Sequence, residues 1–289
     1  MLNIINSLKD SFVDISKLIR YSNSITLSNT LDVNNISGDF VKQLDIETNN
    51  IIKNKLLECS NIRAIGSEEE DHLYYTNNID EEYLVCYDPL DGSSNIDANI
   101  TVGTIFAIYK YNNNRINDGN NIVCSGYCLY GGSTQLIIAT DTVQMLLLNN
   151  ENQFTIINEN MVIKDTGNIY SINEANKYLW DNTIYNDYIN LLIKNKYTSR
   201  WVGSMVADGH RTLIKGGVFC YPENKNSPEG KIRLLYEAYP FAYIFKIAGG
   251  HSSNGEISIL DIPFPENIHQ KTPILLSGNK EYTFFSSLQ

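Results

Sequence analysis

The sequence predicts an α/β fold in which helices cover layers of β-sheet. Apolar segments of strand length follow one another through the first half of the chain, and segments with helical periodicity precede them and recur in the second half. Hydrophobic residues make up 43% of the 289 positions, so a large core can be buried. Strands and helices that alternate bury their apolar faces by stacking in layers. We therefore expect a layered sandwich.

Residues 1–20 are predicted to form an amphipathic helix. The apolar residues that share one face are Ile5, Leu8, Phe12, Ile15 and Ile19. Asp10 and Asp14 stand among few basic residues, so packing against the protein's own sheet is favoured over binding to a membrane surface. The segment lacks the pattern of a signal peptide, and no apolar run in the chain is long enough to span a membrane.

The part of the chain that follows is rich in predicted strands. They cover residues 83–87, 104–109, 124–130, 135–139, 143–148 and 154–158. Asn-rich segments between apolar stretches are typical of loops, and residues 149–152 are expected to join two strands as a hairpin.

Three segments of the second half are predicted to be helical. Residues 186–196 have an apolar helical pattern, residues 204–215 end before two glycines, and residues 240–248 start with a proline and also end before two glycines. Proline at the start of a helix and glycine after its end are the usual arrangement.

The composition excludes several classes of partner. The chain has 22 Lys and Arg against 33 Asp and Glu, a formal net charge of −11 at pH 7. A chain with this charge repels nucleic acids and anionic membranes, so neither is expected as a partner. The five cysteines are an odd number without regular pairing, which indicates free thiols in a reducing compartment. We expect a cytoplasmic location.

The most informative segment is the run Asp88-Pro89-Leu90-Asp91-Gly92-Ser93-Ser94-Asn95-Ile96-Asp97. Asp88 and Asp91 offer the carboxylate oxygens that Mg²⁺ prefers. Gly92 lets main-chain N–H groups approach an anion, and Ser93 and Ser94 add hydroxyl donors. A solvated turn is the alternative, but a predicted strand leads into the run and an apolar stretch follows it. The run therefore predicts a metal site beside a phosphate site.

This run resembles the signature of the metal-dependent, lithium-sensitive sugar and inositol phosphatases. Other segments narrow the resemblance to the class I fructose-1,6-bisphosphatase family, and in the family's order they are residues 38–45, 67–69, 170–174, 200–208 and 230–237. The resemblance covers nearly the whole chain. It implies an α-β-α-β-α sandwich of two lobes with the active site between them. We expect an N-terminal lobe of residues 1–162 with the metal and phosphate motifs, and a C-terminal lobe of residues 163–289 that binds the sugar phosphate.

The resemblance also implies a site with two or three Mg²⁺ ions, for which Mn²⁺ can substitute. The implied ligands are Glu68, Glu69, Asp88, Asp91, Glu237 and the main-chain carbonyl of Leu90. Glu69 and the loop residue Asp45 are implied as the groups that accept the proton of the attacking water. Asp39 matches a further acidic loop residue, for which a plain exposed acid is the alternative. Phosphoryl transfer of this kind needs no covalent nucleophile. Of the four histidines, His72 borders the acidic run and the others lie away from it.

The implied sugar-phosphate pocket is drawn from both halves of the chain. Its residues are Asp91, Gly92, Ser93, Ser94, Asn173, Arg200, Trp201, Tyr221, Lys231 and Arg233. Arg and Lys are the expected partners of phosphate. The residue that matches Arg200 reaches the 6-phosphate in a neighbouring subunit, which implies a homo-oligomer, either a dimer or a tetramer. Trp201 and Asn176 stand where the family usually has Tyr, and these departures bear on the substrate.

AMP is not expected to bind well. Many members of the family bind it with a Thr-Gly-rich helix start and a Lys-Tyr pair. Here Met1-Leu2-Asn3 stands near the first position and Glu82-Tyr83 at the second. A Glu repels a phosphate, and Lys110 leaves one basic residue where the family often has Arg.

The implied activity is Mg²⁺-dependent hydrolysis of the 1-phosphate of fructose 1,6-bisphosphate to fructose 6-phosphate, a step of gluconeogenesis. One alternative is a sedoheptulose-1,7-bisphosphatase, which has the same metal site. The other is a non-catalytic relative that senses a metabolite, which is disfavoured because every expected metal ligand is present. An inositol phosphatase would lack the segment around Lys231.

Overall fold

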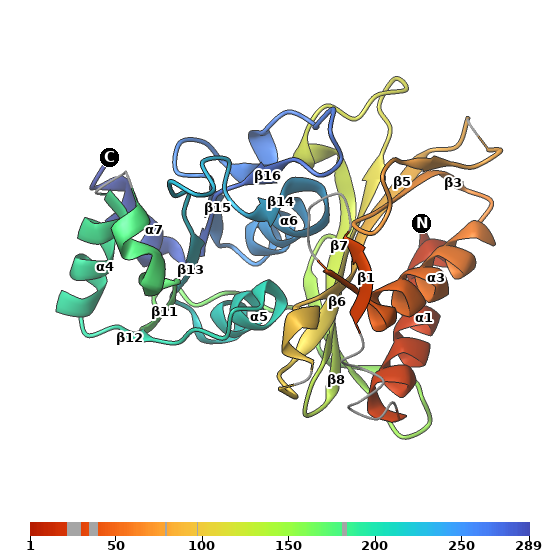
Figure 1. Ribbon diagram of the computed structural model, residues 1–289, viewed down its shortest axis with the longest axis horizontal. Coiled ribbons are helices and arrows are strands. Elements are labelled where there is room, and N and C mark those ends of the chain that lie inside the picture. Colours follow the sequence, from red (N-terminus) through yellow and green to blue (C-terminus); the bar gives the residue numbers. More distant parts are fainter. Residues whose placement is uncertain (22–29, 35–39, 79, 97, 181–183) are drawn as a thin grey trace.

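The molecule consists of five layers, in which helices and sheets alternate (Figure 1). A computed structural model describes residues 1–289 except 22–29, 35–39, 79, 97 and 181–183. The expected α/β sandwich is confirmed: two helices, a large sheet, two further helices, a smaller sheet and a last pair of helices follow one another through the described part of the chain.

The large sheet has eight strands in the order β10-β9-β8-β7-β6-β5-β3-β4. Their bounds are β3 Ile62–Ser67, β4 Tyr74–Tyr75, β5 Tyr83–Asp91, β6 Val102–Lys110, β7 Ile122–Tyr130, β8 Thr134–Ala139, β9 Val143–Leu148 and β10 Phe154–Asn158. Neighbouring strands are antiparallel except β3 and β5, which are parallel. The outer face is covered by α1 (Leu2–Tyr21) and α3 (Gln43–Leu57).

The smaller sheet has five strands in the order β12-β11-β13-β17-β15. Their bounds are β11 Ile169–Ser171, β12 Thr198–Ser199, β13 Val218–Tyr221, β15 His251–Ser253 and β17 Ile274–Ser277. Helices α4 (Ile184–Lys194) and α7 (Asn279–Ser286) form the last layer. Between the two sheets lie α5 (Met205–Lys215) and α6 (Tyr239–Ile247), which contact strands of both. Two short pairs complete the fold, β1 (Thr30–Asn34) with β2 (Phe40–Lys42) and β14 (Ile232–Arg233) with β16 (Lys271–Thr272).

Strand β6 shows why both faces of the large sheet are covered. Ile105 and Ala107 belong to the core cluster shared with α5 and α6, whereas Phe106 and Ile108 belong to the cluster under α1 and α3. Successive side chains of a strand point to opposite faces, so a continuous apolar run needs a partner on each side. A third cluster, which includes Tyr188 of α4, lies under α4 and α7.

The described elements agree with most of the sequence expectations and correct one. The six predicted strands are found as β5 to β10, and the predicted helices as α1, α4, α5 and α6. Asp45 was expected in a loop, but it lies in the first turn of α3 and is buried. All five cysteines are buried and free of disulfides.

Candidate metal and phosphate site

Two carboxylates stand at the carboxyl end of β5 because the strand is irregular there. Asp88 pairs with Ile105 of β6 and Asp91 with Gly103, so β5 has one more residue than its partner over this stretch. Residues three apart in a regular strand point to opposite faces. The extra residue in the bulge changes this alternation and turns both carboxylates to the same side of the sheet.

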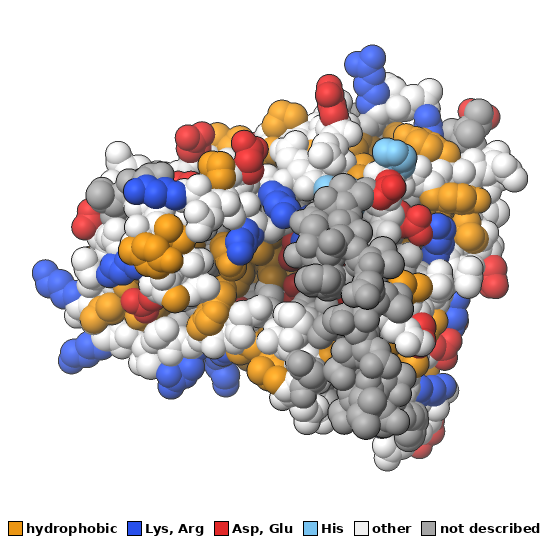
Figure 2. Space-filling view, viewed as in Figure 1, with side chains coloured by type: hydrophobic (Ala, Val, Ile, Leu, Met, Phe, Trp, Pro, Cys, Tyr) orange, Lys and Arg blue, Asp and Glu red, His pale blue; other side chains and the backbone are white. Residues whose placement is uncertain are grey.

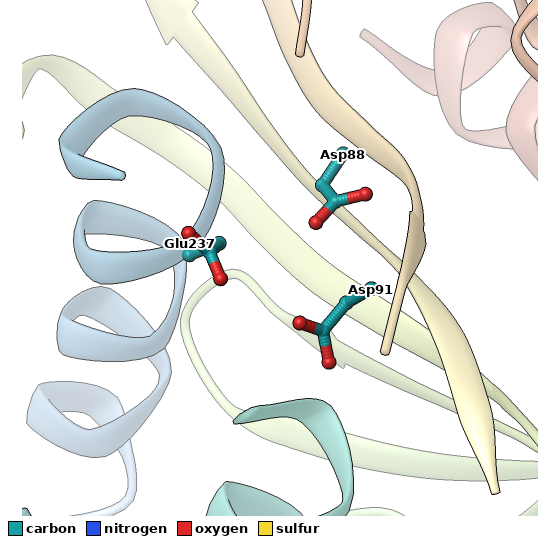
Figure 3. A group of neighbouring side chains, drawn as sticks. All are labelled: Asp88, Asp91 and Glu237. Carbon is teal, nitrogen blue, oxygen red and sulfur yellow. The ribbon is translucent and has the colours of Figure 1, made fainter. Parts of the chain in front are cut away.

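The third carboxylate, Glu237, comes from the other half of the chain. It lies in a π-helical turn, Leu234–Ala238, which leads directly into α6. In Figure 3 the side chains of Asp88, Asp91 and Glu237 point toward a common space between β5 and this helix. Carboxylate oxygens of the three residues lie within 4.8 Å of one another, and all three residues are buried. Local π-helical geometry is frequent at functional sites.

Three buried carboxylates this close together resist ionisation when no cation is present. Burial raises the pKa of Asp91 to about 6, against the hydrogen bonds that lower it. Burial, and then the charge of Asp91, raise the pKa of Glu237 to about 8. Burial, followed by the charges of Glu68, Asp91 and Glu237, holds the pKa of Asp88 well above its usual range. A divalent cation removes this repulsion, and the oxygen-only ligands fit a hard ion such as Mg²⁺.

Asp91 is held in place by the start of α5. One of its carboxylate oxygens accepts hydrogen bonds from Ser204 Oγ at 3.0 Å and from the main-chain N–H of Val206 at 2.7 Å. The N-terminus of a helix favours a negative charge. Gly92 has φ +79°, and a Cβ there would lie 2.7 Å from Ser204 Oγ, so glycine suits both the backbone and the close contact.

Glu68 and Arg233 lie at the edge of the carboxylate cluster. The guanidinium of Arg233 contacts the Glu68 carboxylate at 2.8 Å, and its main-chain N–H donates to Glu237 at 2.6 Å. The neighbouring Glu69 donates its main-chain N–H to Ser67 Oγ at 3.3 Å. At the other side, the main-chain N–H of Leu90 donates to Asp88 Oδ1 at 2.9 Å. The Glu68 carboxylate thus lies close enough to Asp88 for its charge to raise the pKa of that residue.

The other two acids expected in catalysis are Asp45 and Asp39. Asp45 is buried at the start of α3. Asp39 lies outside the described residues. Ser93 stands in the single turn Ser93–Asn95 that follows Gly92, and Ser94 is exposed beside it.

The expected sugar pocket lies mainly on the smaller sheet and its loops. Asn173 caps the short helical turn Glu174–Leu179 by accepting the main-chain N–H of Ala175. Trp201 stacks on Phe219 of β13, with ring centroids 6.3 Å apart, and its ring is 5.8 Å from that of Tyr221. The side chains of Arg200 and Lys231 are exposed.

A charged pair that the sequence did not single out, a buried Asp and a partly buried Arg, supports the segment of this expected pocket. Asp208 of α5 is fully buried and accepts the main-chain N–H groups of Val202 and Gly203. Arg211, one turn later, donates to Asp208 and to the main-chain carbonyl of Arg200. The pair fixes the segment that bears Arg200 and Trp201. An Asp on the buried side of an amphipathic helix was the available signal, since a buried charge needs partners.

The expectation that only His72 borders the acidic run is wrong. His269 is 199 positions from Glu70 in the chain, yet its ring Nε2 lies 2.9 Å from the Glu70 carbonyl oxygen. Its ring also lies against Tyr236, with centroids 5.9 Å apart. The separation of the two residues in the sequence did not indicate this contact, because the loop that bears His269 folds back toward the turn after β3.

The surface view is consistent with an anion-binding cleft. Figure 2 shows Lys and Arg side chains beside a hollow near the middle of this face, with acidic side chains in its wall. Such a division of charge suits a ligand with phosphate groups bound next to a metal.

Within the described part of the chain, no helix has the length and apolar character needed to cross a membrane.

Comparisons with known proteins identify the relatives of this chain. The family model described as "Fructose-1-6-bisphosphatase, N-terminal domain" matches residues 1–159, and that described as "Fructose-1-6-bisphosphatase, C-terminal domain" matches residues 163–287. A fructose-1,6-bisphosphatase class 1 of Persephonella marina is 41% identical over 86% of this chain and 79% of its own length. Fructose-1,6-bisphosphatase 1 of Bos taurus is 38% identical over 99% of this chain and 88% of its own. The holo structure of Leishmania major fructose-1,6-bisphosphatase has a TM-score of 0.93 at 33% identity, over 99% of this chain and 93% of that one.

Proposed function

Since the chain belongs to the class I fructose-1,6-bisphosphatase family, we propose that the carboxylate cluster and the residues around it are the site at which it hydrolyses the 1-phosphate of fructose 1,6-bisphosphate. The protein is a phosphatase that acts on this sugar bisphosphate. The single observation that supports the location of the site is the convergence of Asp88, Asp91 and Glu237.

The family implies a metal cofactor, and we infer Mg²⁺, in two or three ions, with Mn²⁺ as a substitute. Asp88, Asp91 and Glu237 would hold it, with Glu68, Glu69 and the carbonyl of Leu90 completing the ligands. When bound, the metal neutralises charge on the phosphoryl oxygens and on the leaving alkoxide.

The protein's own groups then position the reactants and deprotonate the attacking water. Glu69 and Asp45 are assigned to accept the proton of the attacking water, and Asp39 is assigned an assisting role. Phosphoryl transfer depends mostly on positioning and charge compensation, so carboxylates held by main-chain donors, as Asp91 is by Val206, are suited to it. Gly92, Ser93 and Ser94 bind the 1-phosphate, and Arg233 lies near it.

The C-terminal segments bind the rest of the substrate. Asn173, Tyr221 and Lys231 are assigned to the sugar and its 6-phosphate. Trp201 offers an indole N–H where the family usually has a phenol, and its stacking on Phe219 fixes the ring. We divide the chain functionally into a lobe of residues 1–162 and a lobe of residues 163–289. Arg200 would act in the neighbouring subunit of a dimer or tetramer, and the cytoplasm is the compartment that the free cysteines favour.

Phosphate release from a panel of sugar phosphates tests the proposal. Fructose 1,6-bisphosphate should be hydrolysed with Mg²⁺ and not in excess EDTA, and fructose 6-phosphate should be the product. Sedoheptulose 1,7-bisphosphate and inositol 1-phosphate belong in the same panel. Faster release from either of them, or full activity in EDTA, would contradict the proposed substrate or the proposed metal, respectively.

A further inference from the structure

We propose that His269 is a positioning residue for the metal site. The loop of residues 267–270, which bears it, sets the distance between the two halves of that site. The inference rests on the proposed metal site. One half is the acidic turn after β3, which bears Glu68 and Glu69. The other is the π-helical turn that bears Glu237.

The loop is hydrogen bonded to both halves through consecutive residues. His269 Nε2 contacts the carbonyl oxygen of Glu70 at 2.9 Å. The carbonyl of the next residue, Gln270, accepts the main-chain N–H of Leu234 at 2.8 Å, and Leu234 begins the turn of Glu237. Two adjacent residues thus connect the acidic turn to the Glu237 turn.

The contact defines the protonation of the ring. A carbonyl oxygen can only accept, so Nε2 bears the hydrogen and donates it. Nδ1 is buried and has no hydrogen-bond partner among the described residues. Burial also lowers the pKa of His269, in agreement with a neutral ring. The imidazole therefore contributes one directed hydrogen bond and its packing against Tyr236.

The side chain of Glu70 is held by α3. Its carboxylate accepts from Lys53 Nζ at 2.7 Å and from Asn49 Nδ2 at 3.2 Å. Asn49 is itself buried, and its Oδ1 accepts from Ser67 Oγ at 2.7 Å. With the side chain of Glu70 held by α3, the bond from His269 fixes its main chain. Glu68 and Glu69, which precede it, are thereby held at a set distance from Glu237.

Residues that orient metal ligands in this way typically change metal affinity by about 10–100-fold when they are replaced. We expect His269→Phe, which keeps an aromatic ring and removes the donor, to raise the dissociation constant for Mn²⁺ about 10-fold. His269→Gln should stay close to the parent protein, because its amide N–H₂ reaches about as far as Nε2. His251→Phe is the matched control, since His251 lies in β15 of the smaller sheet, where its ring stacks on Tyr282 and bonds to Asn279 of α7.

Isothermal titration of the metal-free proteins with Mn²⁺ measures this dissociation constant directly. The Mg²⁺ concentration for half-maximal activity and the KM for fructose 1,6-bisphosphate are measured on the same proteins. The metal constants should change in the Phe variant, and the KM should not. Equal Mn²⁺ affinity in His269→Phe and the parent protein would overturn the inference, as would equal losses in the Phe and Gln variants. If His269→Phe does not fold, a loss of affinity in His269→Gln equal to that in His269→Ala overturns it instead.

The same experiment separates this inference from the proposed function. A parent protein that binds Mn²⁺ but releases no phosphate from fructose 1,6-bisphosphate would contradict the function and leave the comparison of variants valid. A parent protein that binds no Mn²⁺ would overturn both the metal site and the role of His269.

Discussion

Glu237 illustrates, at the scale of the residue, how the site opposes folding when no cation is bound. The pKa of its carboxyl is raised from 4.5 to about 8 in the folded chain. Between these pH values the unfolded chain has released the proton and the folded chain has kept it. The free energy of unfolding of the metal-free protein therefore falls as the pH rises through this window.

Replacing Glu237 by Gln should remove this cost. We expect the variant to be more stable than the parent in EDTA at pH 8, by on the order of 1 kcal/mol or more, and to gain little near pH 5. It should also bind Mn²⁺ far more weakly. Thermal unfolding in EDTA at both pH values measures the effect, with Glu151→Gln, at an exposed turn, as the control. A variant that melts below the parent protein at pH 8 would show that the carboxylate is stabilising.

Single residues also show where sequence reasoning ends. Asp88 and Asp91 were predicted as ligands from their spacing. The sequence pattern did not indicate the bulge that turns both side chains to one side of β5. Glu237 was expected from the resemblance and from the apolar stretch before it. His269 contacts a distant main-chain group, and Asp208 contacts main-chain groups in the loop just before α5. Such contacts depend on the path of loops that a local pattern does not describe.

At the scale of the element, the large sheet was predictable and the small one was not. Strands β5 to β10 have five to nine residues, enough for an apolar pattern to be recognised. Strands β11 to β17 have only two to four residues, which is too short for any periodicity. Helix α3 is amphipathic only weakly, because polar residues such as Thr48 and Asn49 are buried with its apolar ones.

The antiparallel pair β5–β6 supports a prediction about regulation. Glu82, just before β5, forms an ion pair with Lys110 at the end of β6, with 3.4 Å between the charged atoms. The basic residue that could attract a nucleotide phosphate is therefore neutralised by its neighbour. We expect AMP to inhibit hydrolysis of fructose 1,6-bisphosphate poorly.

A titration of AMP against phosphate release decides this point. The variant Glu82→Gln, which frees Lys110, should also lack strong inhibition, since a single exposed lysine attracts a phosphate only weakly. Half-inhibition of the parent protein at low micromolar AMP would refute this interpretation of the Glu82–Lys110 pair.

At the scale of the whole molecule, the proposed substrate site draws on segments that lie far apart in the sequence and on a second subunit. Arg200 is exposed in the single chain, and its guanidinium donates to the neighbouring Ser199 carbonyl. By our proposal, this exposed arginine is available to a phosphate bound in an adjacent copy.

Mixing two inactive variants tests this sharing of residues. Arg200→Ala and Asp91→Asn should each lower activity strongly, Asp91→Asn by on the order of 10²-fold as a main electrostatic group is lost. After subunit exchange, hybrids contain some sites with both residues intact, so part of the activity should return. Exchange demonstrated with differently tagged subunits, but without recovery of activity, would show that Arg200 acts within its own chain.

The hydrogen bonds of Asp91 to Ser204 and Val206 have a consequence for a chain that is still being synthesised. The ribosome releases the strand of Asp91 more than one hundred residues before the helix that holds this carboxylate, and the turn of Glu237 emerges later still. Until then the side of β5 to which Asp88 and Asp91 point lacks the helix and the turn that bury these two acids. If the phosphatase centre is the one proposed, a nascent chain therefore lacks it, and the ability to hydrolyse a sugar bisphosphate arises only after most of the polypeptide has been made.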